Sequence, residues 1–279
     1  MNKFYKVTRP DGLDFYSGTV NYRRAIGTTL VVPGYKERDV HDLCSHHVLH
    51  ASCEVLGAMR YAKIPCAIFQ VTGKPVNKQD DKCGFTHLRV VKEYKNLDRI
   101  LGFKYSEAIN PINPFKLLPP TITKKHIGLV EQWANVWDSA CPSVWDSVWD
   151  SVRDSVWDSV RNSVRDSVRD SVWDSVRDSV WDSACPSVWD SVRDSACPSV
   201  WDSVRNSVRE GVWNSVGAYT SSLFPDIQKW EYIDHPLGEN PFTPCIKLWR
   251  MGLVPSFDGK TWRLHGGPDG GILWTQGDK

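Results

Sequence analysis

One four-residue phrase repeats without a break from Val136 to Val216: valine, then tryptophan or arginine, then aspartate, then serine. Every valine of this run falls on a position divisible by four, and alanine replaces it only at Ala140, Ala184 and Ala196. A frame kept over 81 residues is typical of a quasi-one-dimensional repeat, whose units contact their neighbours. Such elements usually bind, space or assemble, so the repeat favours a binding role over a catalytic one.

Two structures compete for the repeat. In an α-helix, four residues turn the chain by about 400°, so the valine stripe drifts by about 40° per tetrad and requires a right-handed supercoil or short helices. Opposite charges three residues apart, as in Asp150 and Arg153, favour the helix. Prolines at the aspartate position (Pro142, Pro186, Pro198) favour a narrow β-solenoid with valine inward, because its corners tolerate proline. We favour a helical or superhelical rod and keep the β-solenoid as the alternative.

The second position of the tetrad varies between tryptophan and arginine. One interpretation is drift at a tolerant, exposed site. The other is a row of exposed aromatic and guanidinium groups that stack on bases, nucleotides or other repeats. The residues of this predicted ligand-binding row are Trp145, Trp157, Arg161, Trp173 and Trp189.

Charge divides the chain into an acidic repeat and basic ends. The run from Val136 to Val216 holds eight arginines, thirteen aspartates and Glu210, so its net charge is 8 − 14 = −6. The whole chain carries +1, which leaves +7 for the rest. This division favours internal docking or staggered self-association as much as nucleic-acid binding. The interleaved aspartates of the repeat repel phosphate, which disfavours nucleic acid and fits self-association.

Local sequence patterns predict an α+β N-terminal domain, a repeat rod and a small β-rich C-terminal module. Strands are expected at 15–18, 28–32, 66–71 and 86–91, and a helix at 43–62. A β-hairpin is expected at 254–265, where Asp258-Gly259 forms the turn. The predicted divisions are a mixed domain at 1–105, a proline-rich linker at 106–120, an entry helix at 121–135, the repeat at 136–219 and the tryptophan-rich module at 220–279.

A cluster of histidines and cysteines lies within the helix predicted at 43–62. Cys44, His46, His50 and Cys53 are residue types that zinc accepts, at close spacing. The paired Cys-x-x-Cys knuckle is absent, and buried thiols or hydrogen-bonded core histidines explain the same residues. We therefore expect no metal site and no cofactor.

Several short motifs are shared with a known group of phage proteins. They are Tyr5-Lys6, Tyr22 with Gly27, Cys44, Leu49-His50-Ala51-Ser52, Phe69-Gln70-Val71, Asp81-Lys82 and Arg89-Val90-Val91-Lys92-Glu93. Over residues 3–95 the chain resembles an uncharacterised N-terminal domain of tailed phages and prophages, although Val48 stands where that family usually has glycine. The stretch from Leu248 to Gly259 is similar to tails of other phage-type proteins with such tetrads.

The order of Tyr5-Lys6, His50 and Ser52 is also distantly similar to ADP-ribosyltransferase-like folds. In those folds a basic residue, a serine and a glutamate surround a dinucleotide. The resemblance implies Lys6, His50, Ser52 and Glu93 as catalytic residues, and Tyr5, Lys6 and His50 as ligand-binding residues with Tyr5 stacking on the ligand.

Together these features predict a phage or prophage accessory protein that acts by binding, sequestration or repeat-mediated assembly, for example against a host defence component. The alternative is an ADP-ribosyltransferase-like or other nucleotide-handling enzyme in the N-terminal domain. The expected partners are a second copy of the chain, a host protein or a nucleotide. The chain has no apolar run of membrane-spanning length and no Cys-x-x-Cys pair among its eight cysteines, so we expect the cytoplasm of the bacterial host and no membrane.

Overall fold

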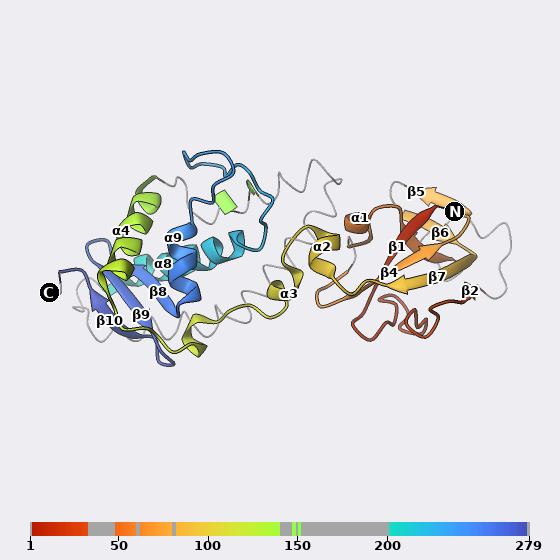
Figure 1. The fold of residues 1–279 in the computed structure, drawn as a ribbon, viewed down its shortest axis with the longest axis horizontal. Coiled ribbons are helices and arrows are strands. Elements are labelled where there is room, and N and C mark those ends of the chain that lie inside the picture. Colours follow the sequence, from red (N-terminus) through yellow and green to blue (C-terminus); the bar gives the residue numbers. More distant parts are fainter. Residues whose placement is uncertain are drawn as a thin grey trace. The chain divides into compact units, whose positions relative to one another are not determined.

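The computed structural model describes residues 2–32, 48–59, 62–79, 82–139, 147, 148, 150, 151 and 201–277, with the backbone alone for 139 and 201–210. These residues form two compact units (Figure 1). The N-terminal unit extends to Ser106, and the C-terminal unit begins at Glu107. Both contain an antiparallel sheet and helices, which makes the chain an α+β protein.

The N-terminal unit is built on a seven-stranded antiparallel sheet in the order β2-β7-β4-β1-β3-β6-β5. The central strand β1 pairs with β4 over its whole length, from Lys3 opposite Thr72 to Thr8 opposite Ala67. The strands are β1 (Lys3–Thr8), β2 (Thr29–Val31), β3 (Leu49–Ser52), β4 (Ala67–Thr72), β5 (Asn77–Gln79), β6 (Lys82–Phe85) and β7 (His87–Glu93).

One face of this sheet is apolar and forms the core of the unit. Alternation along β1 and β4 places Phe4 and Phe69 on this face, where both are buried. Phe4 packs edge-on against Phe85, with 4.9 Å between the ring centroids. Three short helices complete the unit: α1 (Val55–Met59), α2 (Leu97–Leu101) and α3 (Tyr105–Ala108), which crosses the unit boundary.

Three of the four predicted N-terminal strands are confirmed as β2, β4 and β7. The strand predicted at 15–18 is wrong, since these residues form a turn. The helix predicted at 43–62 is also wrong between Leu49 and Ser52, which form β3 and pair with β6. Tertiary pairing overrides the helical pattern there, and helix begins only at Val55.

In its described residues the C-terminal unit combines three α-helices with a three-stranded antiparallel sheet, β10-β9-β8. Its elements are η2 (Pro114–Lys116), α4 (Lys124–Ser139), α8 (Trp201–Ser221), α9 (Thr243–Arg250), β8 (Leu253–Phe257), β9 (Trp262–Gly266) and β10 (Gly271–Thr275). The predicted hairpin is confirmed, because β8 and β9 pair up to Phe257 opposite Trp262 around a turn at Asp258-Gly259. Gly259 has a φ of +90°, which side-chain-bearing residues rarely adopt.

The few tetrads that the structure describes are helical, and the predicted rod stays a prediction. Residues 147, 148, 150 and 151 are helical, and α8 contains the last tetrads of the frame. Val148, Val212 and Val216 are almost completely buried, as an inward valine requires. The other tetrads lie outside the described residues.

The proline-rich segment expected to be a linker is packed within the C-terminal unit. Asn113 and Phe115 are buried, and η2 lies in this segment. The backbone of Ile112 donates a hydrogen bond to the Tyr219 hydroxyl and accepts one from the Trp249 indole. Among the described residues, no helix is both long and apolar enough to cross a membrane.

Candidate functional site

A cavity of about 400 Å³ lies in the N-terminal unit, beside strands β1 and β3. Small-molecule sites typically measure about 300–1,000 Å³, so its size suits a small ligand. Its described lining residues are Tyr5, Lys6, Val7, Phe15, Tyr16, His50, Ala51, Ser52, Gly57, Ala58, Ala62 and Lys82. Four residues that the sequence singles out, Tyr5, Lys6, His50 and Ser52, therefore come together at one cavity.

A row of polar side chains crosses the sheet at this cavity. Tyr5 on β1 lies opposite Ser52 on β3, and Ser52 lies opposite Lys82 on β6. Residues directly opposite in neighbouring strands project to the same face, so the three side chains are neighbours. His50 is two residues before Ser52 and therefore projects to the same face. The register of three strands thus places a phenol, a hydroxyl, an ammonium and an imidazole together.

The ladder between β1 and β3 is short beside the cavity. In the described chain it has one paired position, Tyr5 opposite Ser52, whereas β1 and β4 pair at six. Lys6 also lines the cavity, although alternation along β1 places it on the apolar face with its β4 partner Phe69. Residues from both faces of β1 therefore contribute to the lining.

One wall of the cavity is a turn held by Asp14. The Asp14 carboxylate is buried and accepts hydrogen bonds from the backbone of Ser17 (2.6 Å), Thr19 (3.1 Å) and Val20 (2.9 Å). These bonds close the turn that presents Phe15 and Tyr16, and they explain why residues 15–18 are not a strand. Although burial alone raises the pKa of Asp14, the hydrogen bonds from Ser17 and Val20 hold it below its usual range, so the carboxylate is ionised at neutral pH.

Lys6 is a partly buried cation of the cavity. It is half-buried, and its Nζ lies 5.2 Å from the centre of the Tyr22 ring. Burial lowers the pKa of Lys6 to about 8; the charge of Asp14 opposes this shift and that of Lys82 adds to it. Lys6 makes no hydrogen bond or ion pair with any residue that the structure describes. The charge of Asp14 therefore acts on this desolvated ammonium without a direct ion pair between the two side chains.

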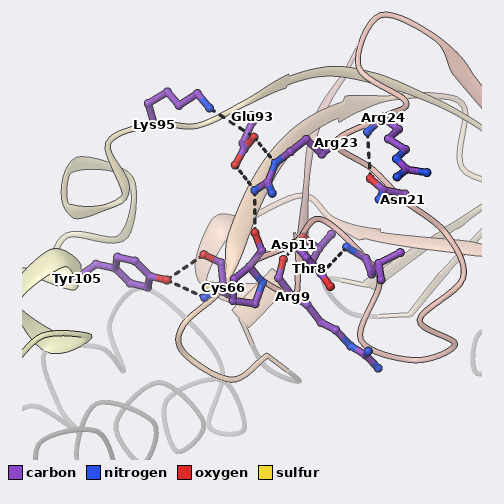
Figure 2. Close-up of polar contacts among 12 residues, drawn as sticks. Thr8, Arg9, Asp11, Asn21, Arg23, Arg24, Cys66, Glu93, Lys95 and Tyr105 are labelled. Atoms are coloured by element: carbon purple, nitrogen blue, oxygen red, sulfur yellow. Dashed lines mark hydrogen bonds and ion pairs between the residues drawn. The ribbon is translucent and has the colours of Figure 1, made fainter.

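Glu93 is not brought to this cavity. It lies at the end of β7, opposite Phe69 on β4, and is absent from the described lining. Its carboxylate accepts two hydrogen bonds from Arg23, at 2.7 and 3.0 Å, and Arg23 also donates to the Pro10 carbonyl (Figure 2). The Arg23 guanidinium holds the pKa of Glu93 below its usual range, against the opposing effect of burial. Glu93 thus ties a loop to the sheet and lies apart from Lys6, His50 and Ser52.

The remaining candidate residues lie mainly outside the described chain. Of the zinc candidates, His50 lines the cavity and Cys53 is half-buried, while Cys44 and His46 are not described. No group of three potential metal ligands occurs among the described residues. The members of the predicted display row, Trp145, Trp157, Arg161, Trp173 and Trp189, all lie outside the described residues.

Three features of the cavity were not predicted from the sequence as site residues. Lys82 belongs to a motif of the phage-domain resemblance, but only strand register places it beside Ser52. Asp14 could have been found as a turn-forming aspartate three residues before a serine. Tyr16, 74% exposed, has no sequence signal that separates it from other surface aromatic residues.

No protein-family model, no curated protein and no solved structure matches the chain.

Proposed function

We propose that this chain acts by binding and that the cavity of its N-terminal unit holds a small anionic ligand. The Lys6 ammonium carries the proposal, because it lies in the cavity near Lys82 and has no hydrogen-bonding or ion-paired partner among the described residues. A buried charge without a partner is unfavourable in a folded protein. A bound anion would give Lys6 the direct ion pair that it lacks among the described residues.

Sequestration is better supported than catalysis. The transferase-like interpretation requires a glutamate beside the ligand, but Glu93 is absent from the described lining and is engaged by Arg23. The resemblance to a phage domain supports the setting of a phage or prophage accessory protein. Such a protein would withdraw a small anionic molecule from a host process, including a host defence.

The test measures thermal unfolding and calorimetric binding of the full-length chain with a panel of small anions, beginning with pyrophosphate and nucleotides. The expected result is stabilisation by at least one anion, lost in Lys6→Met. Lys74→Met is the matched control, because Lys74 is an exposed lysine of the same unit outside the described lining. The proposal is wrong if no anion binds, or if Lys74→Met weakens binding as much as Lys6→Met does.

Repeat-mediated assembly is the second part of the proposal. Its support is that residues 147, 148, 150 and 151 and the tetrads in α8 are helical, and that a regular tetrad frame extends between them in the sequence. A rod of such tetrads would associate with a second copy through its periodic charges. Light scattering over a concentration series tests this directly. A monomer mass at every concentration would reject self-association and leave ligand binding untouched.

A further inference from the structure

We propose that one face of the N-terminal sheet binds single-stranded nucleic acid. This face lies opposite the apolar core face, and we call it the open face. On β1, β4 and β7 it carries polar side chains that are exposed or half-buried: Lys3, Tyr5, Gln70, Thr72, Arg89 and Lys92. Lys6 is not one of them, because alternation along β1 places it on the apolar face with Phe69. The inference therefore goes beyond the proposed anion site and does not rest on it.

Strand register brings these side chains into two rows across the sheet. The first row is Lys3, Thr72 and Arg89, and the second is Tyr5, Gln70 and Lys92. Residues directly opposite each other in neighbouring strands project to the same face. The positions between the rows, such as Phe4 and Val71, project into the core and are buried. Both rows therefore end in a cation on β7.

Two tyrosine rings lie together on the open face. Tyr94 follows β7, and its amide donates a hydrogen bond to the Ile68 carbonyl of β4. Its ring stacks on that of Tyr5, with 6.0 Å between the centroids and 26° between the planes. The Tyr94 hydroxyl donates to Oε1 of Gln70 at 3.2 Å, which holds the ring over β4. Nucleobases stack on half-exposed rings of this kind.

Lysine side chains lie directly against these rings. The Nζ atom of Lys3 is 4.7 Å from the centre of the Tyr5 ring and 5.6 Å from that of Tyr94, and Nζ of Lys92 is 5.2 Å from the Tyr94 ring. Hydrogen bonding to Tyr5, and then to Tyr94, raises the pKa of Lys3, so its ammonium stays charged at neutral pH. A lysine stem is flexible, so the ammonium turns toward a phosphate when a base takes the ring. Rings beside cations thus match bases beside phosphates.

The charge of this unit is complementary to a phosphate backbone. The described strands of the sheet contain one acidic residue, Glu93, which lies opposite Phe69 and is paired with Arg23 (Figure 2). Residues 1–106 contain 17 lysines and arginines and 10 aspartates and glutamates, so their net charge is 17 − 10 = +7. The interleaved aspartates that disfavour nucleic acid belong to the repeat. That expectation therefore does not extend to the N-terminal sheet.

A single strand suits the open face better than a duplex does. In a duplex the bases stack on one another and pair, so their faces are not available to a protein ring. The bases of a single strand are free to stack on Tyr5 and Tyr94 while the phosphates contact the cations. RNA and DNA share these bases and phosphodiesters. An acidic peptide would offer charge to the cations and nothing that uses the rings.

The test is fluorescence anisotropy of the full-length chain with labelled single-stranded RNA and DNA, each about 12 nucleotides long. We expect at least one of them to bind at least tenfold more tightly than a duplex of the same length, and the tighter of the two identifies the source. Tyr94→Ala should weaken binding about tenfold, whereas Tyr94→Phe, which keeps the ring, should retain it.

A pair of arginines separates a phosphate contact from general charge. Arg89→Met should reduce the slope of log affinity against log salt by about 0.7, as expected for one lost phosphate contact on a single strand. Arg24→Met is the matched control and should leave the slope unchanged. Arg24 is also exposed, but it lies on the loop whose Tyr22 and Ala25 pack into the apolar core face. Equal effects of the two variants would overturn the inference.

The remaining outcomes separate this inference from the proposed anion site. Lys6→Met should leave oligonucleotide binding unchanged. If it abolishes that binding while Arg89→Met retains it, the oligonucleotide lies at the cavity and the open-face assignment is wrong. If polyaspartate competes as well as unlabelled oligonucleotide and Tyr94→Ala has no effect, the face binds an acidic segment instead. If no single strand binds, the inference is wrong, and the small-anion panel still tests the cavity.

Discussion

Lys6 places an ammonium group on the sheet face that elsewhere carries the apolar core. Its neighbours along and across the strands, Phe4 and Phe69, are both buried. An unpaired charge at such a position opposes folding, since the unfolded chain hydrates it fully. Natural proteins retain such unfavourable buried charges mainly at functional sites.

Replacement of Lys6 should therefore separate stability from binding. Lys6→Met keeps the length of the side chain and removes the charge, so we expect the free energy of unfolding to rise by about 1 kcal/mol or more. Binding of the anionic ligand should be lost in the same variant. Chemical denaturation and calorimetry measure the two quantities. A variant that is less stable than the parent would show that Lys6 has a structural role instead.

Ligand affinity should fall as the pH rises through 8. The pKa of Lys6 is about 8 because the side chain is buried, so its ammonium loses its proton near this pH, well before an ordinary lysine at 10.5. An anion binds the protonated form, while a phosphate monoester keeps its charge above its second pKa of about 6. Calorimetry between pH 7 and 9 should show this loss. In Lys6→Arg, whose guanidinium stays charged, any remaining binding should be flat over the same range.

Because of His265, the C-terminal unit should be less stable at acidic pH. Its Nδ1 lies 3.0 Å from the Gly270 carbonyl and must donate to it, so Nε2 accepts from the Ser256 hydroxyl at 2.7 Å. Burial lowers the pKa of His265 from 6.5 to about 4, so the folded form stays neutral where the unfolded form takes up a proton. Stability from this residue is thus complete above pH 6.5 and is lost as the pH falls toward 4.

Denaturation at pH 7 and pH 5 measures this loss. Each pH unit within the window should cost at most about 1.4 kcal/mol from His265. His265→Gln retains a polar side chain that does not titrate, so its stability should change less between the two pH values. Equal pH dependence in the variant and the parent would assign the effect to other groups.

At the scale of elements, the tetrad pattern is compatible with a helix that other elements of its unit surround on all sides. The valine stripe drifts around a helix, so a partner on one side cannot cover it. The C-terminal half of α8 meets this requirement because it is buried on nearly all sides, including Val212, Ser215 and Val216. The Ser215 hydroxyl donates to the Gly211 carbonyl at 2.9 Å, which satisfies a polar group inside the core. Serine is thereby compatible with an inward position.

A second use of the tetrad serine is to hold the backbone of another segment. Ser147 donates from its hydroxyl to the Glu231 carbonyl, and the Glu231 amide donates to the Ser151 hydroxyl at 2.6 Å. Tyr232 adds a hydrogen bond from its hydroxyl to the Asp150 carboxylate at 2.7 Å. Serines four residues apart lie on one helix face, and here they contact both polar groups of one residue. The tetrad thus contributes specific polar contacts besides valine burial.

The same substitution at two valines of the frame should give unequal losses. Val216→Asp buries a charge in α8, where Val216 is 0% exposed, and should cost several kcal/mol or prevent folding. Val136→Asp changes the same tetrad position in α4, where the valine is half-buried, and should cost clearly less. Melting temperatures of both variants provide the measurement. Equal losses would show that tetrad position, and not burial, controls stability.

At the scale of the whole molecule, the chain contains two units with separate cores. The Phe4, Phe69 and Phe85 core belongs to the sheet of the N-terminal unit. The C-terminal unit has its own aromatic packing, in which Tyr219 stacks on Trp249 with 5.5 Å between the ring centroids. Units with separate cores can unfold separately.

Calorimetric melting of the full chain should therefore show two transitions. A ligand of the cavity stabilises only the unit that binds it, so it should raise one transition and leave the other in place. The transition that the ligand leaves in place should be the one that falls between pH 7 and pH 5, through His265. A single transition that responds to both ligand and acid would show that the two units unfold together.

Local patterns in the sequence determined much of the secondary structure of this protein. The valine frame predicted inward valines, and Val212 and Val216 of α8 are buried, although their helix neighbours are buried as well. Asp258-Gly259 determined the turn between β8 and β9, because glycine adopts the positive φ required there. The order of Tyr5, Lys6, His50 and Ser52 was also visible, since these residues lie in short motifs.

Only the tertiary structure decided what surrounds those residues. The cavity takes its lining from β1, β3 and β6, and pairing between distant segments is not encoded in any local period. The same long-range register brought Lys82 to Ser52, and it placed Glu93 at the end of β7 with Arg23. Spacing along a chain determines which side chains share a face, but strand register determines which of them meet, because it depends on the free energy of the whole packed sheet.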